Sequence, residues 1–262
     1  MPLLFRGNSP GFISYEGKRV EKVLYNGTLV WKAFPAKKPL EDTSWEDISI
    51  ICRAGLASEY WQLGDTKCLI SGDSSVQLQI IGFDHDPVTD AESYGREKAA
   101  MTLQMVQLIP ELSAVMNNTN YIDTAWYHPS SMYCSDIRST LFPSYFQSAL
   151  PVALQNVIVP VQKEYYTVSD KGENTISDTL FLPSLDEVLG TVTSFFGSEG
   201  KQYAFFAQGG SKIKKTADGT ASSWWTRSPT GSNARFYLIN TSGALTSASA
   251  ISTSYAPPCL CI

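Results

Sequence analysis

The chain has 262 residues, of which 43% are hydrophobic and 12% aromatic, enough for one large domain or one domain plus a small appendage. Its formal net charge of −5 argues against binding to nucleic acid, which needs clustered Lys and Arg. The sequence contains no apolar run long enough to insert into a membrane and no secretory signal pattern at its start, so we expect synthesis in the cytoplasm without a signal peptide.

Residues 1–38 are expected to form a small β-hairpin unit ahead of the main domain, which we place at residues 39–262. Two β-prone runs, Lys18–Tyr25 and Thr28–Trp31, flank an Asn-Gly dipeptide, which favours a tight hairpin turn. The stretch 33–40 contains two prolines and two lysines, a composition typical of a linker.

The first helix of the main domain is predicted directly after Ser44. This residue is a good N-cap, Asp47 supplies a carboxylate three positions later, and apolar residues follow at helical spacing. Residues 60–84 are expected to form strands separated by Gly-containing turns, because apolar and polar residues alternate from Val76 to Ile80.

Further helices are predicted over Glu97–Leu108 and from Ser135 to Phe146, the second with a kink or restart at Pro143. The apolar run Leu180–Pro183 is expected to be a buried strand that leads into another helix.

That helix is predicted over Leu185–Leu189, with Ser184 and Glu187 as a capping pair and Gly190 at its end. Short strands follow, at Trp224-Trp225, Arg235–Asn240 and Ala256–Cys261. Helices and strands mixed without regular βαβ alternation predict an α+β fold.

The segment Asp84-His85-Asp86 is the clearest candidate for a metal site. Zinc needs three or four convergent ligands, and the other histidine, His128, has no partner motif. Calcium needs a loop of spaced carboxylates, to which Asp86, Asp90 and Glu92 correspond only loosely. We therefore expect a turn at a strand end whose carboxylates are exposed or cap a helix, with no metal or cofactor.

Motifs for enzymatic chemistry are not found. The sequence contains no Gly-x-Ser-x-Gly, and the glycines near Gln208–Lys212 lack the spacing of a phosphate-binding loop. The five cysteines include no C-x-x-C pair, and Cys259 and Cys261 have no His nearby to complete a metal site. We expect most of the cysteines to be buried as small apolar side chains, and we expect no catalytic residues.

The hexapeptide Trp224–Pro229, WWTRSP, combines two large apolar side chains with one arginine. Adjacent side chains point to opposite faces of a strand, so we expect one tryptophan to pack inside and the other to border a surface. The planar guanidinium of Arg227 suits the fixing of a loop through carbonyls or a carboxylate. A structural role is favoured over ligand contact.

The C-terminal segment, Thr226–Ile262, has an unusual composition. Its 37 residues include no Lys, Glu, Gln, Met or Trp, although the first 225 residues contain 46 of these. Between Thr241 and Ala256, 12 of 16 residues are Ser, Thr or Ala. Exposed strands and turns rich in Ser and Thr are naturally poor in Glu and Lys, but this does not readily account for the missing Gln, Met and Trp.

Several ordered motifs between about Tyr60 and Ile262 resemble a domain of uncharacterised function that is common in phages and prophages of Firmicutes. The motifs are GDTKCLISGD, VQLQIIGFDHD, SYGREKAAMTLQM, DIRSTL, ALPVALQNVIVPVQK, DTLFLPSLDEVLG, GKQYAFF, WWTRSP and PPCLCI. The N-terminal EKVLYNGTLVWK also resembles a short module of phage tail and baseplate proteins.

The WWTRSP ending is similar to that of the C-type-lectin-like fold, which is shared by formylglycine-generating enzymes and the variable proteins of diversity-generating retroelements. In those variable proteins, mutation of template adenines converts Asn codons into a set that excludes Lys, Glu, Gln, Met and Trp. This resemblance implies a C-type-lectin-like domain whose segment 226–262 is diversified. The chain departs from the pattern at Tyr255–Pro258, where relatives have a Gly-x-Arg-Pro-like turn, and at Thr124–Trp126, where they have Gly-Gly-Trp.

The resemblance implies a non-enzymatic protein on a phage tail that binds a bacterial cell-surface receptor, either protein or glycan, and joins other tail proteins through its N-terminal module. Alternation along the strand places Phe236 and Leu238 inward and Arg235 and Tyr237 outward. The predicted ligand-binding residues are Thr230, Ser232, Asn233, Ala234, Arg235, Tyr237, Asn240, Ser242, Ala244, Thr246, Ser247, Ala248, Ser249, Ala250, Ser252, Thr253 and Tyr255.

Two alternatives remain open beside this hypothesis. An oxidase-like enzyme on the same fold would use Cys259 and Cys261, and it requires both thiols to be exposed near a cleft. A purely structural tail component would pack Thr241–Ala256 against another chain. A homo-oligomer is compatible with either tail role.

Overall fold

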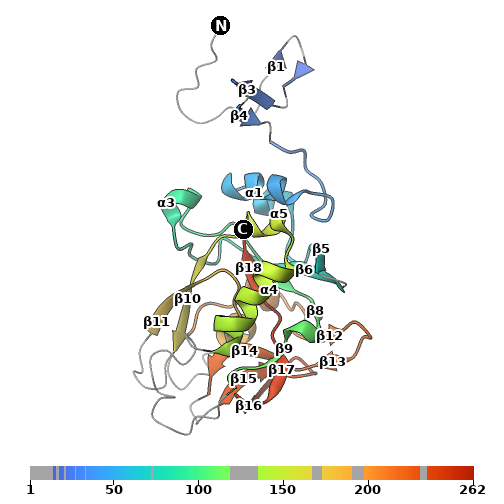
Figure 1. The fold of residues 1–262 in the computed structure, drawn as a ribbon, viewed down its shortest axis with the longest axis vertical. Coiled ribbons are helices and arrows are strands. Elements are labelled where there is room, and N and C mark those ends of the chain that lie inside the picture. The colour runs from blue at the N-terminus through green and yellow to red at the C-terminus, as the bar shows by residue number, and fades with distance from the viewer. Residues whose placement is uncertain are drawn as a thin grey trace.

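The computed structural model describes residues 14–15, 18–20, 22–26, 28–32, 34–71, 74–118, 135–166, 173–190, 198–230 and 235–262. The chain is 25% helical and 34% strand, which confirms the prediction of a mixed α+β fold (Figure 1). No helix in these ranges is both long and apolar enough to cross a membrane.

The strands form two larger sheets and several small ones. The larger sheets have the orders β16-β15-β14-β17-β9 and β18-β7-β6-β5, and the small ones are β13-β12-β8, β10-β11, β3-β4 and β1-β2. The bounds are β1 Ser14–Tyr15, β2 Lys18–Arg19, β3 Lys22–Tyr25, β4 Thr28–Lys32, β5 Thr66–Ser71, β6 Ser74–Phe83, β7 Met101–Met105, β8 Gln107–Leu108, β9 Ser113–Val115, β10 Val161–Tyr166, β11 Glu173–Asp178, β12 Lys214–Thr216, β13 Ala221–Ser222, β14 Trp224–Pro229, β15 Arg235–Ile239, β16 Leu245–Ser249, β17 Thr253–Tyr255 and β18 Cys259–Cys261.

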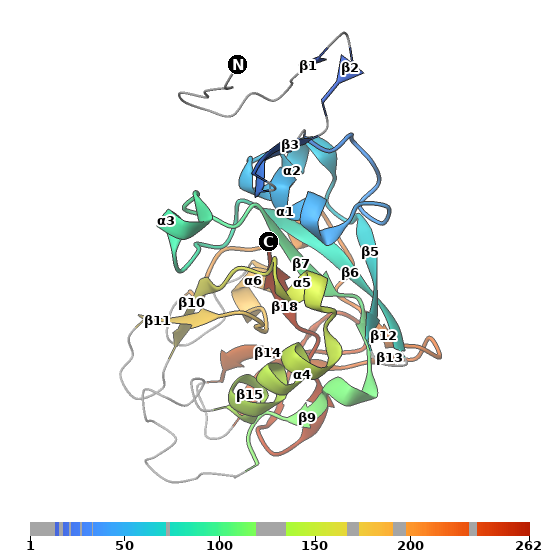
Figure 2. The ribbon, with the colours of Figure 1, turned by 45° about the horizontal axis from the view of Figure 1, so that its top comes forward.

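Helices are short and lie around the sheets (Figure 2). A π-helical turn, Ile137–Leu141, runs directly into α4, and a 3₁₀ turn covers Pro110–Leu112. The α-helices are α1 Trp45–Arg53, α2 Ala57–Tyr60, α3 Ala91–Tyr94, α4 Phe142–Ala149, α5 Val152–Gln155, α6 Leu185–Leu189 and α7 Ala204–Ala207.

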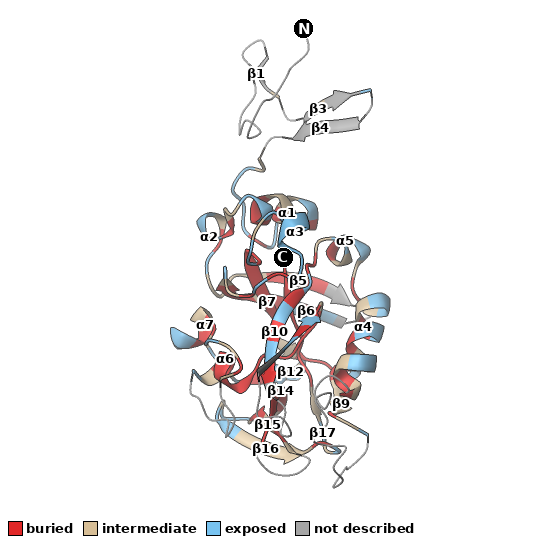
Figure 3. Cartoon of the chain, turned by 90° about the vertical axis from the view of Figure 1, so that its left-hand side faces the viewer, coloured by how far each residue is buried: buried red, intermediate tan, exposed pale blue. Residues whose placement is uncertain are grey.

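The buried residues form two hydrophobic cores. Figure 3 shows that buried residues run through the sheets and the inner sides of the helices. Because side chains alternate along a strand, β18 sends Leu260 into the first core and its two cysteines into the second. Strand β14 does the same with Trp225 and Trp224. Helices α1, α4 and α5 contribute to the first core, and α6 and α7 to the second.

Two helices form where local capping signals predict them. Ser44 accepts a hydrogen bond from the backbone of Asp47 at the start of α1. Ser184 and Glu187 form a reciprocal capping box at the start of α6, which ends at Gly190 with a positive φ of 71°. The restart at Pro143 is also confirmed, since Pro143 lies in the first turn of α4.

The helix predicted over Glu97–Leu108 is wrong, because this stretch contains β7 and β8. Strand β7 pairs with β6 on one side and β18 on the other, and all five of its residues are buried. The helix preference of residues such as Met101 and Leu103 is overridden here by burial between two strands. The predicted strand Leu180–Pro183 makes a single bridge, from Phe181 to Cys259.

The N-terminal hairpin β3–β4 lies at one end of the molecule, with β3 and β4 antiparallel as predicted (Figure 1). The segment that follows it makes hydrogen bonds with α2 and the residue beyond. Tyr60 donates to the carbonyl of Pro35, and the Trp61 indole donates to that of Lys38, at 2.9 and 3.1 Å. The predicted linker therefore follows a fixed path along α2.

Candidate functional site

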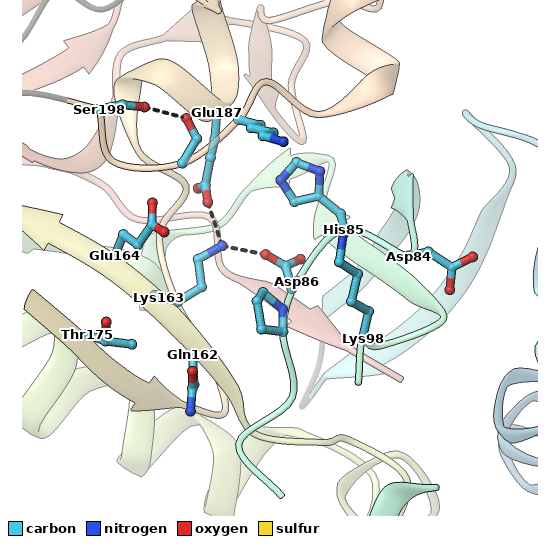
Figure 4. Close-up of a pocket in the computed structure, with 13 residues that line it drawn as sticks. Asp84, His85, Asp86, Lys98, Gln162, Lys163, Glu164, Thr175, Glu187 and Ser198 are labelled. Atoms are coloured by element: carbon cyan, nitrogen blue, oxygen red, sulfur yellow. Dashed lines mark hydrogen bonds and ion pairs between the residues drawn. The ribbon is translucent and has the colours of Figure 1, made fainter. Parts of the chain in front are cut away.

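The centre of the second core is occupied by a buried lysine. Lys163 on β10 donates to Asp86 Oδ1 and Glu187 Oε1, each at 2.5 Å, and to the Tyr203 hydroxyl at 3.2 Å. The side chains of Lys163, Asp86 and Glu187 are 3%, 1% and 2% exposed. Three donors thus meet three acceptors, so the ammonium is fully hydrogen-bonded. Figure 4 shows its contacts with the two carboxylates.

Arg227 extends this cluster from β14. Its guanidinium donates to both oxygens of Glu187, at 2.5 and 3.2 Å, and to the carbonyls of Glu164, Leu182 and Glu199. The prediction that Arg227 fixes loops through carbonyls and a carboxylate is confirmed. Ser228 also connects β14 to a neighbouring segment, since its Oγ accepts a hydrogen bond from the first backbone N–H of α6 at 2.9 Å.

Asp86 is surrounded by neutral donors in addition to Lys163. Tyr203 lies 3.0 Å from both carboxylate oxygens, Thr102 Oγ1 donates to Oδ2 at 2.5 Å, and Cys261 Sγ donates to Oδ2 at 3.4 Å. Burial by itself would raise the pKa of Asp86, but the Lys163 ammonium and the hydrogen bonds lower it to about 2. Asp86 is therefore ionised when the ion pair forms.

Lys163 and Glu187 are also charged, because opposite charges nearby outweigh the effect of burial on their pKa values. Burial opposes the charge of Lys163, but Asp86 and Glu187 together raise its pKa. Burial also opposes the charge of Glu187, and here Arg227 and Lys163 outweigh it and lower the pKa. Two cations and two anions, Lys163, Arg227, Asp86 and Glu187, therefore form a charge-balanced group that joins β10, β14, α6 and the end of β6.

Local backbone features bring these side chains together. Glu187 belongs to the α6 capping box, so its position follows from the helix start. Gly82 allows the Tyr203 ring to approach β6, because a Cβ at Gly82 would lie 2.9 Å from that ring. Between Gly82 and Asp86 the chain turns at Asp84, which adopts a positive φ of 47°.

A pocket of about 400 Å³ lies over the cluster (Figure 4). His85 stacks on Tyr203 with ring centroids 4.1 Å apart, and burial lowers the pKa of His85, which favours the neutral imidazole. The lining residues are Asp84, His85, Asp86, Pro87, Lys98, Gln162, Lys163, Glu164, Thr175, Glu187, Ser198, Gly200 and Lys201.

The predicted Asp-His-Asp cluster is divided between two environments. Asp84 is exposed, pairs with Arg96, and points away from Asp86 (Figure 4). His85, Asp86 and Glu187 do bring potential ligand atoms within 4.8 Å of one another. The Lys163 ammonium already lies between the two carboxylates, so they neutralise a protein cation. The expectation that Asp86 would be exposed or capping is wrong.

A carboxylate beyond this turn caps a helix that the sequence reasoning did not predict. Asp90 Oδ1 accepts from the backbone of Ser93 at 3.0 Å and caps α3.

The predicted C-terminal surface is formed by β15, β16 and β17. Phe236 and Leu238 are 0% and 3% exposed, as the alternation predicts. Arg235 is half-buried and donates to the carbonyl of Ser247 across the strand pair at 2.7 Å. Other predicted residues that are exposed or half-exposed in the structure are Asn240, Ser242, Ala244, Thr246, Ser247, Ser249, Ser252 and Thr253.

Two other positions in the predicted set are buried. Thr230 and Ala250 are 7% and 0% exposed, so the prediction that they lie on the surface is wrong. Ala248, Tyr237 and Tyr255 are half-exposed, with Ala248 packed partly against the first core and the two tyrosines partly against the second. The reason is that both faces of this sheet are covered over much of its width. Ser232, Asn233 and Ala234 lie outside the described residues.

Both tryptophans of the WWTRSP segment are buried, each with 0% exposure, so the expectation that one borders a surface is wrong. They do point to opposite faces, because Trp225 belongs to the first core and Trp224 to the second. Their indoles donate to the carbonyls of Ala114 and Lys212, each at 3.0 Å.

The cysteines of β18 are also inaccessible. Cys259 and Cys261 are both 0% exposed, and burial raises the pKa of each thiol above its usual value. The oxidase-like alternative requires exposed thiols near a cleft, and this arrangement counts against it.

Sequence reasoning missed Lys163 and Tyr203 as parts of a cluster. Lys163 follows an apolar stretch, which is a weak signal for a buried amine. Its partner Asp86 lies 77 residues away along the chain, and no local pattern indicates that pairing.

Comparison with known proteins gives a family but no closer relative. Neither the curated proteins nor the solved structures include a match to the chain. The model of one family matches residues 109–262, which contain Lys163, Glu187, Tyr203 and Arg227 as well as β14–β18. The chain therefore belongs to the family described as a domain of unknown function, DUF6273.

Proposed function

We propose that the chain is a non-enzymatic ligand-binding protein of phage origin, with a C-type-lectin-like domain that presents a diversified surface on β15–β17. Its target is a receptor on the bacterial cell surface, and its N-terminal hairpin attaches it to other tail proteins. The observation that carries the proposal is the loss of five residue types directly after Trp225.

The packing of the C-terminal segment supports this proposal. The side chains that hold the sheet in place, Trp224, Trp225 and Arg227, are fully buried and come before or at the start of the segment. Residues such as Ser249 and Thr253 are partly or fully exposed and contribute little to the cores. Changes at such positions would alter a binding surface at little cost in folding free energy.

The burial pattern also limits the surface. Residues 256–262 are buried, and β18 pairs with β7, so these positions cannot vary freely. The proposed binding surface therefore consists of the exposed and half-exposed residues between Arg235 and Thr253.

Cell binding tests the surface. A fluorescently labelled chain is mixed with a panel of Firmicutes cells, and binding is measured by flow cytometry. The variant Ser249→Arg/Thr253→Arg should lose binding, because two long cations cover the proposed surface. The matched control Ser58→Arg/Ser144→Arg makes the same change at exposed positions on α2 and α4 and should bind normally. Equal binding by the two double variants would contradict the surface assignment.

Diversification is tested separately by sequencing the locus. The proposal requires a nearby reverse transcriptase gene and a near-identical repeat of the segment that differs only at adenines. A locus that lacks both would contradict diversification and leave the cell-binding result to decide the binding role.

A further inference from the structure

The contact between Lys163 and Asp86 has the geometry of a reactive pair. The amine nitrogen lies 2.5 Å from Oδ1 of Asp86, and Glu187 Oε1 lies 2.5 Å from the same nitrogen. Each of the three side chains is at most 3% exposed. Nucleophile, carboxyl group and a second carboxylate that can accept a proton are therefore held together, with little exposed surface, at the base of the pocket.

We propose that Lys163 and Asp86 join covalently through an intramolecular amide bond between Nζ and the side-chain carboxyl carbon. Glu187 is the catalytic base. The bond would link the start of β10 to the turn after β6, across 77 residues of sequence.

The reaction is a condensation that releases one water molecule. Transfer of a proton from Nζ to Asp86 along their hydrogen bond converts the ion pair into a neutral amine and a carboxylic acid. The amine attacks the carboxyl carbon, and Glu187 accepts a proton from Nζ as the C–N bond forms. The same proton then passes to the departing hydroxyl group, so Glu187 is regenerated and no oxidant or cofactor is needed.

Neutral donors are in place for the transition state. Tyr203 lies 3.0 Å from each Asp86 oxygen, and Thr102 Oγ1 lies 2.5 Å from Oδ2. These hydroxyls would stabilise the negative charge that develops on Oδ2 during attack. The ring of Phe181, with its centroid 4.4 Å from Nζ, closes the site on an apolar side.

The charge distribution selects Asp86 over Glu187 as the carboxyl group that reacts. Glu187 also pairs with Arg227, and its conversion to an amide would remove the two-point carboxylate partner of a buried guanidinium. Among the described contacts, Lys163 is the only cation bonded to Asp86. Their condensation removes one positive and one negative charge from the interior, and the pair Arg227–Glu187 stays balanced.

Energetics favour the bonded product at this position. A buried ion pair bears the desolvation cost of two charges. An amide has no net charge, so its formation removes this cost. The other buried lysines, Lys67 and Lys214, donate in the described structure to backbone carbonyls, so they serve as unreactive internal comparisons.

Mass spectrometry of the full chain tests the proposal. Under reducing and denaturing conditions, the intact mass should be lower than the sequence mass by one water molecule. A tryptic digest should lack cleavage at Lys163 and contain a branched product in which the segment with Asp86 is joined to the segment after Arg138. An intact mass equal to the sequence mass, or a water loss mapped to another position, would overturn the proposal.

Variants add a second criterion that does not depend on the wild type alone. Lys163→Arg keeps the charge but removes the reactive amine, so its mass should equal its sequence mass. Glu187→Gln keeps both reacting groups and should form the bond more slowly, by about a hundredfold or more. A full water loss in the Lys163→Arg variant would contradict the assignment. If either variant fails to fold, the branched peptide of the wild type still decides the question.

Discussion

Arg227 on β14 and Glu187 on α6 form a two-point ion pair in which both side chains are almost completely buried, at 1% and 2% exposure. Both oxygens of Glu187 accept from the guanidinium, and one of them also accepts from Lys163. The pair therefore couples the WWTRSP strand to the first residues of α6, and several consequences can be measured.

Removal of the Arg227 guanidinium should strongly destabilise the chain. Arg227→Met leaves Glu187 with one cation where it had two and leaves three carbonyls without their donor, so we expect a loss of about 3–5 kcal/mol in unfolding free energy. The matched control is Arg138→Met, which breaks the more exposed ion pair with Asp178 and should cost about 1 kcal/mol. Urea denaturation of both variants measures these losses in unfolding free energy, and equal losses would contradict the prediction.

Lys214 should make stability depend on pH. Burial lowers the pKa of this amine from 10.5 to about 7, so the unfolded chain binds more protons than the folded chain between these values. The free energy of unfolding should therefore gain a contribution that increases as pH rises from about 7 towards 10.5. Lys214→Met removes this contribution, whereas Lys215→Met, at an exposed neighbour, should retain it. Parallel pH–stability curves for wild type and Lys214→Met would contradict the prediction.

Neighbouring residues at the end of β16 should differ sharply in their tolerance to substitution. Ser249 is half-exposed and Ala250 is 0% exposed. Ser249→Tyr should change the unfolding free energy by less than about 0.5 kcal/mol. Ala250→Tyr forces a large ring into a packed core and should cost about 3 kcal/mol or more. Thermal unfolding of the two variants separates these outcomes, and similar melting temperatures would show that the burial assignment is wrong.

The rate at which each cysteine is labelled should depend on how far its thiol is buried. Among the described cysteines, Cys68 is partly exposed, whereas Cys52, Cys259 and Cys261 are buried. Burial also raises the pKa of Cys52 to about 12, which lowers the fraction of reactive thiolate. Iodoacetamide should label Cys68 in the native chain and the other three only after unfolding. Rapid native labelling of Cys259 or Cys261 would restore the thiol-based alternative.

Local signals in the sequence predicted local structure well. Ser44 and Asp47 define the start of α1, and Ser184 and Glu187 define that of α6, because the capping atoms lie within three residues of one another. The inward positions of Phe236 and Leu238 follow from strand alternation alone.

The same reasoning could not predict which residues pair when they lie far apart in the sequence. Glu97–Leu108 has helix-forming composition, and its strand exists because β6 and β18 lie on either side of it. The ionic role of Arg227 was predictable from its chemistry, but its partner Glu187 lies 40 residues away. Tyr237 lies on the face opposite Phe236, as alternation predicts, but it is only half-exposed because part of that face packs against the second core.

The position of β18 has a consequence for synthesis on the ribosome. Strands β5, β6 and β7 are made early, but the strand that pairs with the remaining side of β7 contains Cys259–Cys261, and the backbone of Ile262 exchanges two hydrogen bonds with Met101. The nascent chain must therefore keep one side of β7 unpaired until Ile262 has left the exit tunnel. During that interval the unpaired strand edge is open to contact with other nascent chains.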